Sequence, residues 1–259
     1  MKALWMIPLA LACANKGIGS GVDPSPSWSS PGGRAQAKIE LAEALVLNGT
    51  PEAALQMISQ MVEQGIRHPD LYVLQGRALA DMGLDHEAEV ALSIAARRTP
   101  GNAEAHNRLG ILYLDQSRTA EAVKRFKAAA RKAPTNAEVH NNYGFALMAS
   151  GQHEEAVVVL RKALMLDGSQ QRTRNNLGFA LAVTGKDKAA WKVFKAGTDE
   201  ASARYNLALA QEMRGDKAVA ISNYELVLAV DPSLTAASEA LARLTTAEPT
   251  GVESTPEEH

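Results

Sequence analysis

Few side chains in this sequence stand in a pattern that could carry out catalysis or hold a metal. His153 is followed by two glutamates, as at the start of a zinc-protease helix, but the second histidine that such a helix needs is missing. Residues 184–186 (Thr-Gly-Lys) match the end of a phosphate-binding loop but lack its earlier glycine and its following hydroxyl. No serine or cysteine has a base nearby in the pattern of a nucleophile. The sequence therefore predicts a protein that is not an enzyme and that uses no metal, cofactor or small-molecule substrate.

The single cysteine, Cys13, has the clearest chemical role, because it follows an N-terminal apolar stretch. The stretch begins after Lys2 and is too short to span a bilayer. Residues 1–12 resemble a bacterial lipoprotein signal peptide, although Ala10 stands where that pattern usually has leucine. The resemblance implies cleavage that leaves Cys13 first and carrying palmitate or another fatty acid. With Ala14 in place of aspartate, it also implies the periplasmic face of the outer membrane. The alternative is an ordinary secretory signal and a soluble periplasmic protein.

Composition favours helices for the rest of the chain. Of its 259 residues, 46% are hydrophobic and only 5% are aromatic, and alanine and leucine dominate. Small side chains let helices pack closely, so the sequence predicts an all-α fold. The formal net charge of -2 gives no field that would attract nucleic acid. One cysteine also excludes a disulfide framework.

The two ends of the chain lack an apolar period. Residues 13–34 are rich in glycine, serine and proline, which predicts a flexible tether. Residues 247–259 contain four glutamates and two prolines with almost no apolar side chains, which predicts a disordered acidic tail. The folded part is therefore expected over residues 35–246.

Between these ends the sequence repeats every 34 residues. A small residue, an alanine twelve positions later and a larger apolar residue four positions further on recur together. The small residues are Ala42, Gly76, Gly110, Gly144, Gly178 and Ala208. The alanines are Ala54, Ala88, Ala122, Ala156, Ala190 and Ala220. The larger residues are Ile58, Leu92, Phe126, Leu160, Phe194 and Tyr224.

Each series has a mechanical explanation in a stack of helix pairs. The small residue lets the second helix approach the first, and the two apolar residues lie on one face of the second helix. Such a pair cannot bury its apolar face alone, so several must stack and a terminal helix must cover the last one. The spacing predicts a capping helix over 235–244 and a fifth repeat that is four residues short. The repeats are expected at 35–68, 69–102, 103–136, 137–170, 171–200 and 201–234.

These residues resemble the pattern of the tetratricopeptide-repeat family. The copy over 103–136 carries nearly the whole pattern, as Leu109, Gly110, Tyr113, Ala122, Phe126, Ala129 and Pro134. The resemblance implies an α-solenoid, a right-handed superhelix of about six helix-turn-helix repeats with a C-terminal cap. It also implies a non-enzymatic scaffold for protein-protein interaction. His106 and His140 stand at position four of their repeats, where the family commonly places an aromatic ring, so both are expected to be structural.

A surface for protein or peptide binding is expected on the inner face of the first helices. Asparagines recur there at positions five and six of successive repeats and could hold an extended peptide by its backbone. Aromatic and methionine side chains would add an apolar floor. The alternative is that the asparagines tie one repeat to the next and that the phenylalanines are half-buried core. The candidate residues are Arg77, Asn107, Ile111, Asn141, Asn142, Phe145, Met148, Asn175, Asn176, Phe179, Tyr205, Asn206, Leu209 and Met213.

The middle of the repeat region is basic. Residues 103–200 contain 15 basic and 10 acidic side chains, whereas residues 35–102 contain 5 and 9. The basic side chains either are solvated residues of the outer helices or form a docking patch for an acidic partner. They include Lys124, Arg125, Lys127, Arg131 and Lys132.

A narrower resemblance begins at the runs 174–182 (R-N-N-L-G-F-A-L-A) and 204–210 (R-Y-N-L-A-L-A) with the shortened repeat between them. These segments, the leader and the cap are similar to the lipoprotein of the Tad (Flp) pilus assembly system, the TadD family, and to type IV pilotin lipoproteins. That resemblance implies an assembly factor for a pilus or related secretion system, with a secretin as a partner. A lipoprotein or soluble periplasmic cochaperone of general cell-envelope biogenesis is the alternative.

Overall fold

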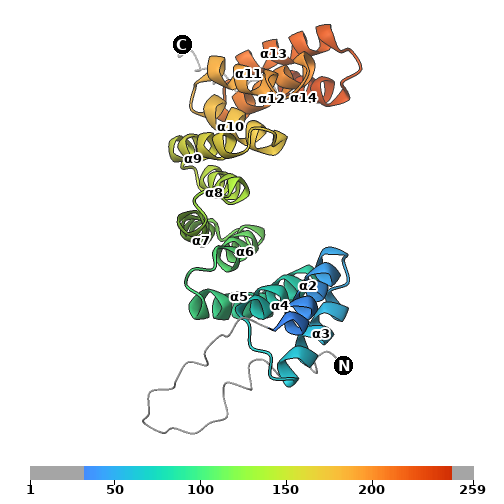
Figure 1. Cartoon of the computed structure of the whole chain (residues 1–259). Coiled ribbons are helices and arrows are strands. Elements are labelled where there is room, and N and C mark those ends of the chain that lie inside the picture. The colour runs from blue at the N-terminus through green and yellow to red at the C-terminus, as the bar shows by residue number, and fades with distance from the viewer. Residues whose placement is uncertain (1–31, 247–259) are drawn as a thin grey trace, which may run out of the picture. The chain divides into compact units, whose positions relative to one another are not determined.

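The computed structural model describes residues 32–246, which form thirteen helices and no strand (Figure 1). The all-α class expected from the sequence is confirmed. The chain divides into two compact units, residues 1–134 and 135–259, and each is described by itself. The signal peptide expected over 1–12, Cys13, nearly all of the tether over 13–34 and the tail over 247–259 lie outside the described residues.

In the first unit, six helices form three hairpins, and each helix packs on the next one in the chain. The first helices of the hairpins also pack side by side, α4 against both α2 and α6. The helices are α2 (Gly33–Leu47), α3 (Pro51–Glu63), α4 (Pro69–Asp81), α5 (Asp85–Arg98), α6 (Ala103–Asp115) and α7 (Thr119–Lys132).

The second unit continues with three hairpins and one more helix. Here α10 packs against both α8 and α12, and α14 packs on α13 at the end of the stack. The helices are α8 (Ala137–Ala149), α9 (His153–Leu166), α10 (Gln171–Val183), α11 (Asp187–Lys195), α12 (Glu200–Arg214), α13 (Lys217–Val230) and α14 (Thr235–Thr246).

Four first helices, α4, α6, α8 and α10, begin at the first residue of an expected repeat. Three boundaries differ by one or two residues. Helix α2 begins at Gly33, inside the segment expected to be tether, because the Gly32 carbonyl already accepts the N–H groups of Ala35 and Gln36. Helix α12 begins one residue early, at Glu200, and α14 extends two residues past 244, to Thr246.

The small residue of each first helix allows the two helices of a hairpin to touch. A Cβ atom on Gly76 would lie 2.5 Å from Leu92 Cγ, and one on Gly110 would lie 2.8 Å from the Phe126 ring. In the second unit, a Cβ atom on Gly144 would lie 2.6 Å from Leu160 Cδ2. All of these distances are shorter than van der Waals contact, so the glycines are required by packing.

Turns within the hairpins use a residue with positive φ to end the first helix. Gly185, with φ of 77°, is typical, since glycine adopts this conformation without strain. Ser117 takes the same conformation with φ of 59°, where a side chain is disfavoured.

Carboxylates tie neighbouring repeats together in both units. In the first unit, Glu89 on α5 accepts hydrogen bonds from Tyr113 Oη and Arg118 Nη1, each 2.8 Å long. In the second, Asp187 on α11 accepts from Arg214 Nη1 at 2.7 Å and from Gln211 Nε2 at 2.8 Å. The arginine hydrogen bond lowers the pKa of each carboxyl.

The fifth repeat is short because its second helix is short. Helix α11 has 9 residues, whereas α9 and α13 have 14 each. Gly197 follows it and lies against α10, where a Cβ atom would lie 2.8 Å from Arg174 Cδ. The chain then enters α12, whose first turn is capped by Asp199, which accepts the Ser202 N–H at 2.9 Å.

Candidate functional site

The first helices of the second unit carry large apolar side chains that are not fully buried. Phe145 on α8 and Met213 on α12 are 40% and 67% exposed, although both are large hydrophobic side chains. Met148 on α8, Phe179 on α10 and Leu209 on α12 are half-buried. Phe179 is fixed by an edge-to-face contact with the buried ring of Phe194, with the centroids 5.5 Å apart. We call the surface formed by these five side chains the apolar face.

The asparagines of the second unit are largely committed to one another. Asn176 Nδ2 donates to Asn141 Oδ1 at 2.9 Å, and Asn141 Nδ2 donates to Asn142 Oδ1 at 3.4 Å. Asn141 and Asn142 are buried. These contacts join α8 to α10, so Asn141 and Asn176 tie one repeat to the next, which was the alternative considered from the sequence.

The remaining polar candidates have varied surroundings. Asn107 in the first unit is buried, like Asn141 and Asn142. Asn175 accepts a hydrogen bond from Gln171 at 2.8 Å. Tyr205 is half-buried against the ring of Tyr224, at 5.7 Å between centroids, and Asn206 next to it is also half-buried. Burial withdraws Asn107, Asn141 and Asn142 from any row of amides facing solvent.

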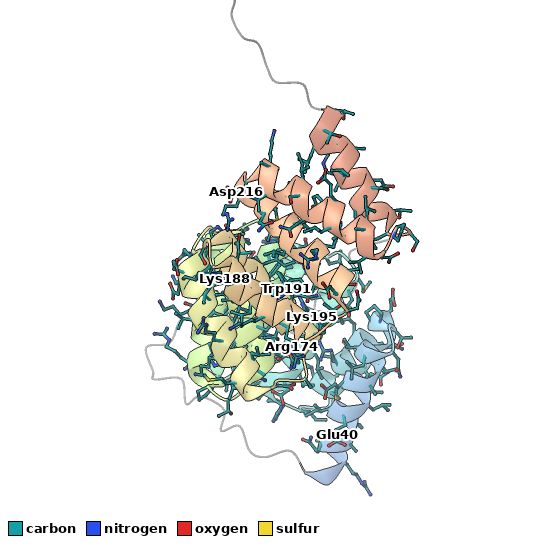
Figure 2. The ribbon with its side chains drawn as sticks, turned by 90° about the horizontal axis from the view of Figure 1, so that it is seen from above. Glu40, Arg174, Lys188, Trp191, Lys195 and Asp216 are labelled. Atoms are coloured by element: carbon teal, nitrogen blue, oxygen red, sulfur yellow. The ribbon has the colours of Figure 1, made fainter. Side chains whose placement is uncertain are left out.

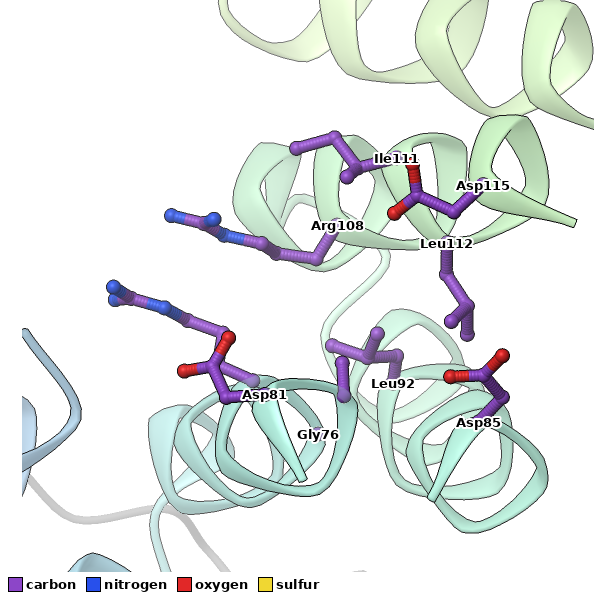
Figure 3. A pocket seen from close by; sticks show the side chains of 10 residues that line it. Gly76, Asp81, Asp85, Leu92, Arg108, Ile111, Leu112 and Asp115 are labelled. Carbon is purple, nitrogen blue, oxygen red and sulfur yellow. The ribbon is translucent and has the colours of Figure 1, made fainter. Parts of the chain in front are cut away.

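The first unit has a charged pocket instead. It has a volume of about 190 Å³ and is formed by α4, α5 and α6 (Figure 3). Two of its lining residues, Arg77 and Ile111, were expected on the inner face at position nine of their repeats. The other residues that line it are Gly76, Ala80, Asp81, Asp85, Leu92, Arg108, Leu112 and Asp115.

Two arginines dominate one part of this pocket. The Arg77 side chain is 12% exposed, and its Nη1 lies 3.6 Å from Glu43 Oε1. Arg108 is 33% exposed, and its Nε donates to Glu104 Oε1 at 2.6 Å. Burial lowers the pKa of Arg77, and the nearby positive charge of Arg108 lowers it further. Arg77 also lines an adjoining cavity of about 210 Å³ together with Glu43 and Glu104.

Sequence reasoning identified Arg77 but missed Arg108 and the pocket's aspartates. A signal was present, because Arg108 occupies position six, where the three following repeats have Asn142, Asn176 and Asn206. Reading that position as a row of asparagines left out the first three repeats, which have Glu40, Leu74 and Arg108 there.

Most of the basic side chains of the middle segment lie on the second helices α7, α9 and α11. Lys124, Lys127, Arg131 and Lys132 on α7 are exposed, and Arg125 is half-buried. In the second unit, Lys188 and Lys195 lie along α11 with Trp191 between them (Figure 2). Arg204 stacks on the Trp191 ring at 4.9 Å from its centroid. The exposed lysines have the surroundings of solvated outer residues.

The two position-four histidines lie within helices. His140 on α8 is buried, and His106 on α6 is half-buried, with its pKa lowered by burial and then by the charge of Arg125. Across residues 32–246, no cluster of three or more histidine, cysteine, aspartate or glutamate side chains could hold a metal ion. Within the same residues, no helix combines the length and the apolar character needed to cross a membrane.

Comparison with known proteins agrees with this repeat structure. Two family models, each described as tetratricopeptide repeat, match residues 73–137 and 113–172. No curated protein sequence matches the chain. Several solved structures share its fold and are at most 23% identical in sequence.

For three of these structures, the match extends over nearly the whole length of the other protein. PilF of Pseudomonas aeruginosa is 18% identical with a TM-score of 0.63, over 81% of this chain and 97% of PilF. YrrB, described as having an unusual peptide-binding site, is 21% identical with a TM-score of 0.59, over 71% and 96%. MamA of Desulfovibrio magneticus RS-1 is 23% identical with a TM-score of 0.55, over 64% and 94%. The family models identify tetratricopeptide repeats within residues 73–172, and the solved structures show the same helical-repeat fold.

Proposed function

We propose that this chain is a non-enzymatic scaffold that binds a partner protein through the apolar face of its second unit. The observation that carries the proposal is the exposure of Phe145 on α8 and of Met213 on α12. Both helices pack against α10, which carries the half-buried Phe179, and α12 also carries the half-buried Leu209. Large apolar side chains gathered at a surface are typical of interaction sites. Methionine is suited to such a surface because its flexible side chain adapts to different partners.

We further propose that the scaffold is held at the periplasmic face of the outer membrane by a lipid on Cys13 and assists assembly of a Tad/Flp or type IV pilus, or of a related secretion system. Two observations support this role. The leader and the runs at 174–182 and 204–210 resemble pilus assembly lipoproteins. The fold also extends over nearly the whole of PilF. A secretin or another pilus or secretion component is the proposed partner.

Binding by the apolar face is tested by photocrosslinking in the source cells. A photoreactive residue in place of Met213 should capture a partner, whereas one in place of Val158 should not. Val158 is a matched control because it is 68% exposed on the second helix α9. A photoreactive residue in place of Leu209, on the same face, should also capture the partner. The double substitution Phe145→Asp and Met213→Asp should abolish that capture. Its circular dichroism spectrum should be unchanged. Equal capture at Met213 and Val158 would contradict the proposal.

The anchor and the pilus role are tested separately. Wild-type protein should incorporate a radioactive fatty acid and fractionate with outer membrane, and Cys13→Ser should do neither. Deletion of the gene should reduce the amount of multimeric secretin and of surface pili. An unlabelled, soluble wild-type protein whose loss leaves pili intact and damages the envelope would favour the periplasmic cochaperone instead.

A further inference from the structure

The charged pocket of the first unit contains an arginine whose position the fold does not explain. Arg77 carries five N–H donors, yet its contact with Glu43 at 3.6 Å is too long for a hydrogen bond. Among the described residues, no hydrogen bond to its guanidinium is found. Its side chain is only 12% exposed. Three carboxylates, those of Glu104, Glu43 and Asp81, act on its charge. None of the described residues accepts a hydrogen bond from it, so its donors are available to a ligand.

A second guanidinium lies at the same pocket. Arg108 uses Nε to bind Glu104, which leaves its two terminal nitrogens without a hydrogen bond among the described residues. The charge of Arg108 acts directly on Arg77. Two neighbouring guanidiniums with unused donors form a site suited to an anion, and planar carboxylates match the geometry of arginine especially well.

The rest of the pocket has the opposite charge. Figure 3 shows Arg108 and Asp81 toward one end of the pocket and Asp85 and Asp115 toward the other. Leu92 lies near the middle and Leu112 lies between Asp85 and Asp115, and together they give the pocket an apolar wall. An occupant that satisfies both ends carries a negative and a positive group on an apolar stem.

The size of the pocket restricts the kind of occupant. Sites for free small molecules generally have about 300–1,000 Å³, and this pocket has about 190 Å³. A volume of this size suits one or two side chains of a polypeptide that lies across the first helices. The adjoining cavity, which shares Arg77, allows the segment to continue toward α2.

We infer that this pocket binds a mixed-charge segment of a partner polypeptide, with a glutamate or aspartate carboxylate held by Arg77 and Arg108 and a lysine or arginine of the same segment beside Asp85 and Asp115. The inference rests on the proposed interaction function and adds the chemistry of the recognised sequence. It assigns to the first unit a charge-selective role that the apolar face of the second unit does not have.

The experiment uses an array of end-capped peptides that carry one glutamate and one lysine at every spacing and in both orders, in an alanine and leucine background. The Cys13→Ser variant, purified as a full chain, should bind best to peptides with one particular order and spacing of the glutamate and the lysine. Arg77→Met should weaken binding of the selected peptide by about 10- to 100-fold. Asp115→Asn should remove the preference for lysine and keep that for glutamate. Arg131→Met, on the outer helix α7, is the matched control and should bind as wild type.

Thermal melting separates a binding role for Arg77 from a structural one. Arg77→Met should melt at the wild-type temperature or above it, because it removes a largely buried charge that donates no hydrogen bond to the described residues. A lower melting temperature together with unchanged peptide selection would overturn the inference. Peptide binding that ignores charge and is lost only in the variant with Phe145→Asp and Met213→Asp would also overturn it, while leaving the proposed interaction function in place.

Discussion

The two units of this chain have the same helical hairpins and different inner faces. In the first unit, Arg77 and Arg108 line a small pocket that also contains three aspartates. In the second, the equivalent first helices expose Phe145 and Met213 and commit Asn141 and Asn176 to each other. The contact of a small residue with the second helix is common to both, as Gly76 with Leu92 and Gly144 with Leu160.

The difference shows that the positions that build the repeat are separate from those that give it chemistry. Positions eight, twenty and twenty-four fix how the helices pack, and they keep their character along the chain. Positions six and nine differ between the units: Arg108 at position six of the first unit corresponds to Asn142 and Asn176 in the second. Arg77 at position nine corresponds to Phe145 and Phe179. A solenoid can therefore change its ligand from one segment to the next without changing its fold.

The largest expected effect tests what the two units share. Gly144→Leu should destabilise the second unit by about 1–3 kcal/mol or more, since the new side chain would force α9 away from α8. Gly76→Leu should do the same to the first unit through Leu92. Thermal and urea unfolding measure both. The control Arg161→Leu, on the exposed side of α9, should change stability by less than about 0.5 kcal/mol. If both glycine variants melt like the control, the 34-residue register is wrong.

The next prediction concerns the hydrogen bond between Asn176 and Asn141 in the second unit. Asn176→Ala should cost about 1–3 kcal/mol, because it removes the donor to the buried Asn141 Oδ1 and leaves that oxygen unsatisfied. Asn206→Ala, at the same position of the next repeat, is half-buried and should cost less. Urea unfolding compares the two variants. If both variants lose equally little free energy of unfolding, neither asparagine is structural and both remain candidates for binding a partner.

The smallest expected effect is a difference in pH dependence between two helix caps. Asp199 caps α12, and its pKa is lowered to about 2 by the hydrogen bonds from the Ser202 N–H and hydroxyl. Because the folded pKa is depressed, the stabilisation is present above the unfolded value of about 4 and is lost as the pH falls toward 2. Asn102 caps α6 in the first unit through Ala105 N at 2.9 Å and does not titrate.

Exchanging the two capping residues should change how strongly the melting temperature depends on pH. Asp199→Asn should reduce the drop in melting temperature between pH 5 and pH 2.5 relative to wild type. Asn102→Asp should increase it. Parallel melting curves for the three proteins at both pH values would show that neither cap controls the acid response.

The packing of the repeats was predictable because it depends on residue size alone. A glycine opposite a leucine or phenylalanine at fixed spacing has one compact solution, and Gly144 lies against Leu160 as expected. The short fifth repeat was also visible, since deleting four residues shifts the pattern between Gly178 and Ala208.

The inner faces were harder to predict because polar side chains choose among several partners. In the sequence, Asn141 and Asn176 look the same as asparagines that bind a peptide, because both kinds occur at positions five and six of a repeat. Only the distance of 2.9 Å between their amides shows that they bind each other. Arg77 was predicted to face inward, but its poor pairing depends on where Glu43 and Arg108 lie, and no sequence pattern gives those distances.

The capping helix α14 has a consequence for hydrogen exchange. It packs on α13, and Ala237 and Ala240 are its buried residues. Leu241 and Leu244 also pack against the core. A helix at the end of the stack still opens more easily than one packed on both sides, so its amides should lose protection before those of α13. One ion pair, Arg243 Nη2 with Glu212 Oε1 at 2.6 Å, also joins it to α12. Exchange in the second unit should therefore begin at its C-terminal end and reach the buried Tyr224 only after α14 has opened.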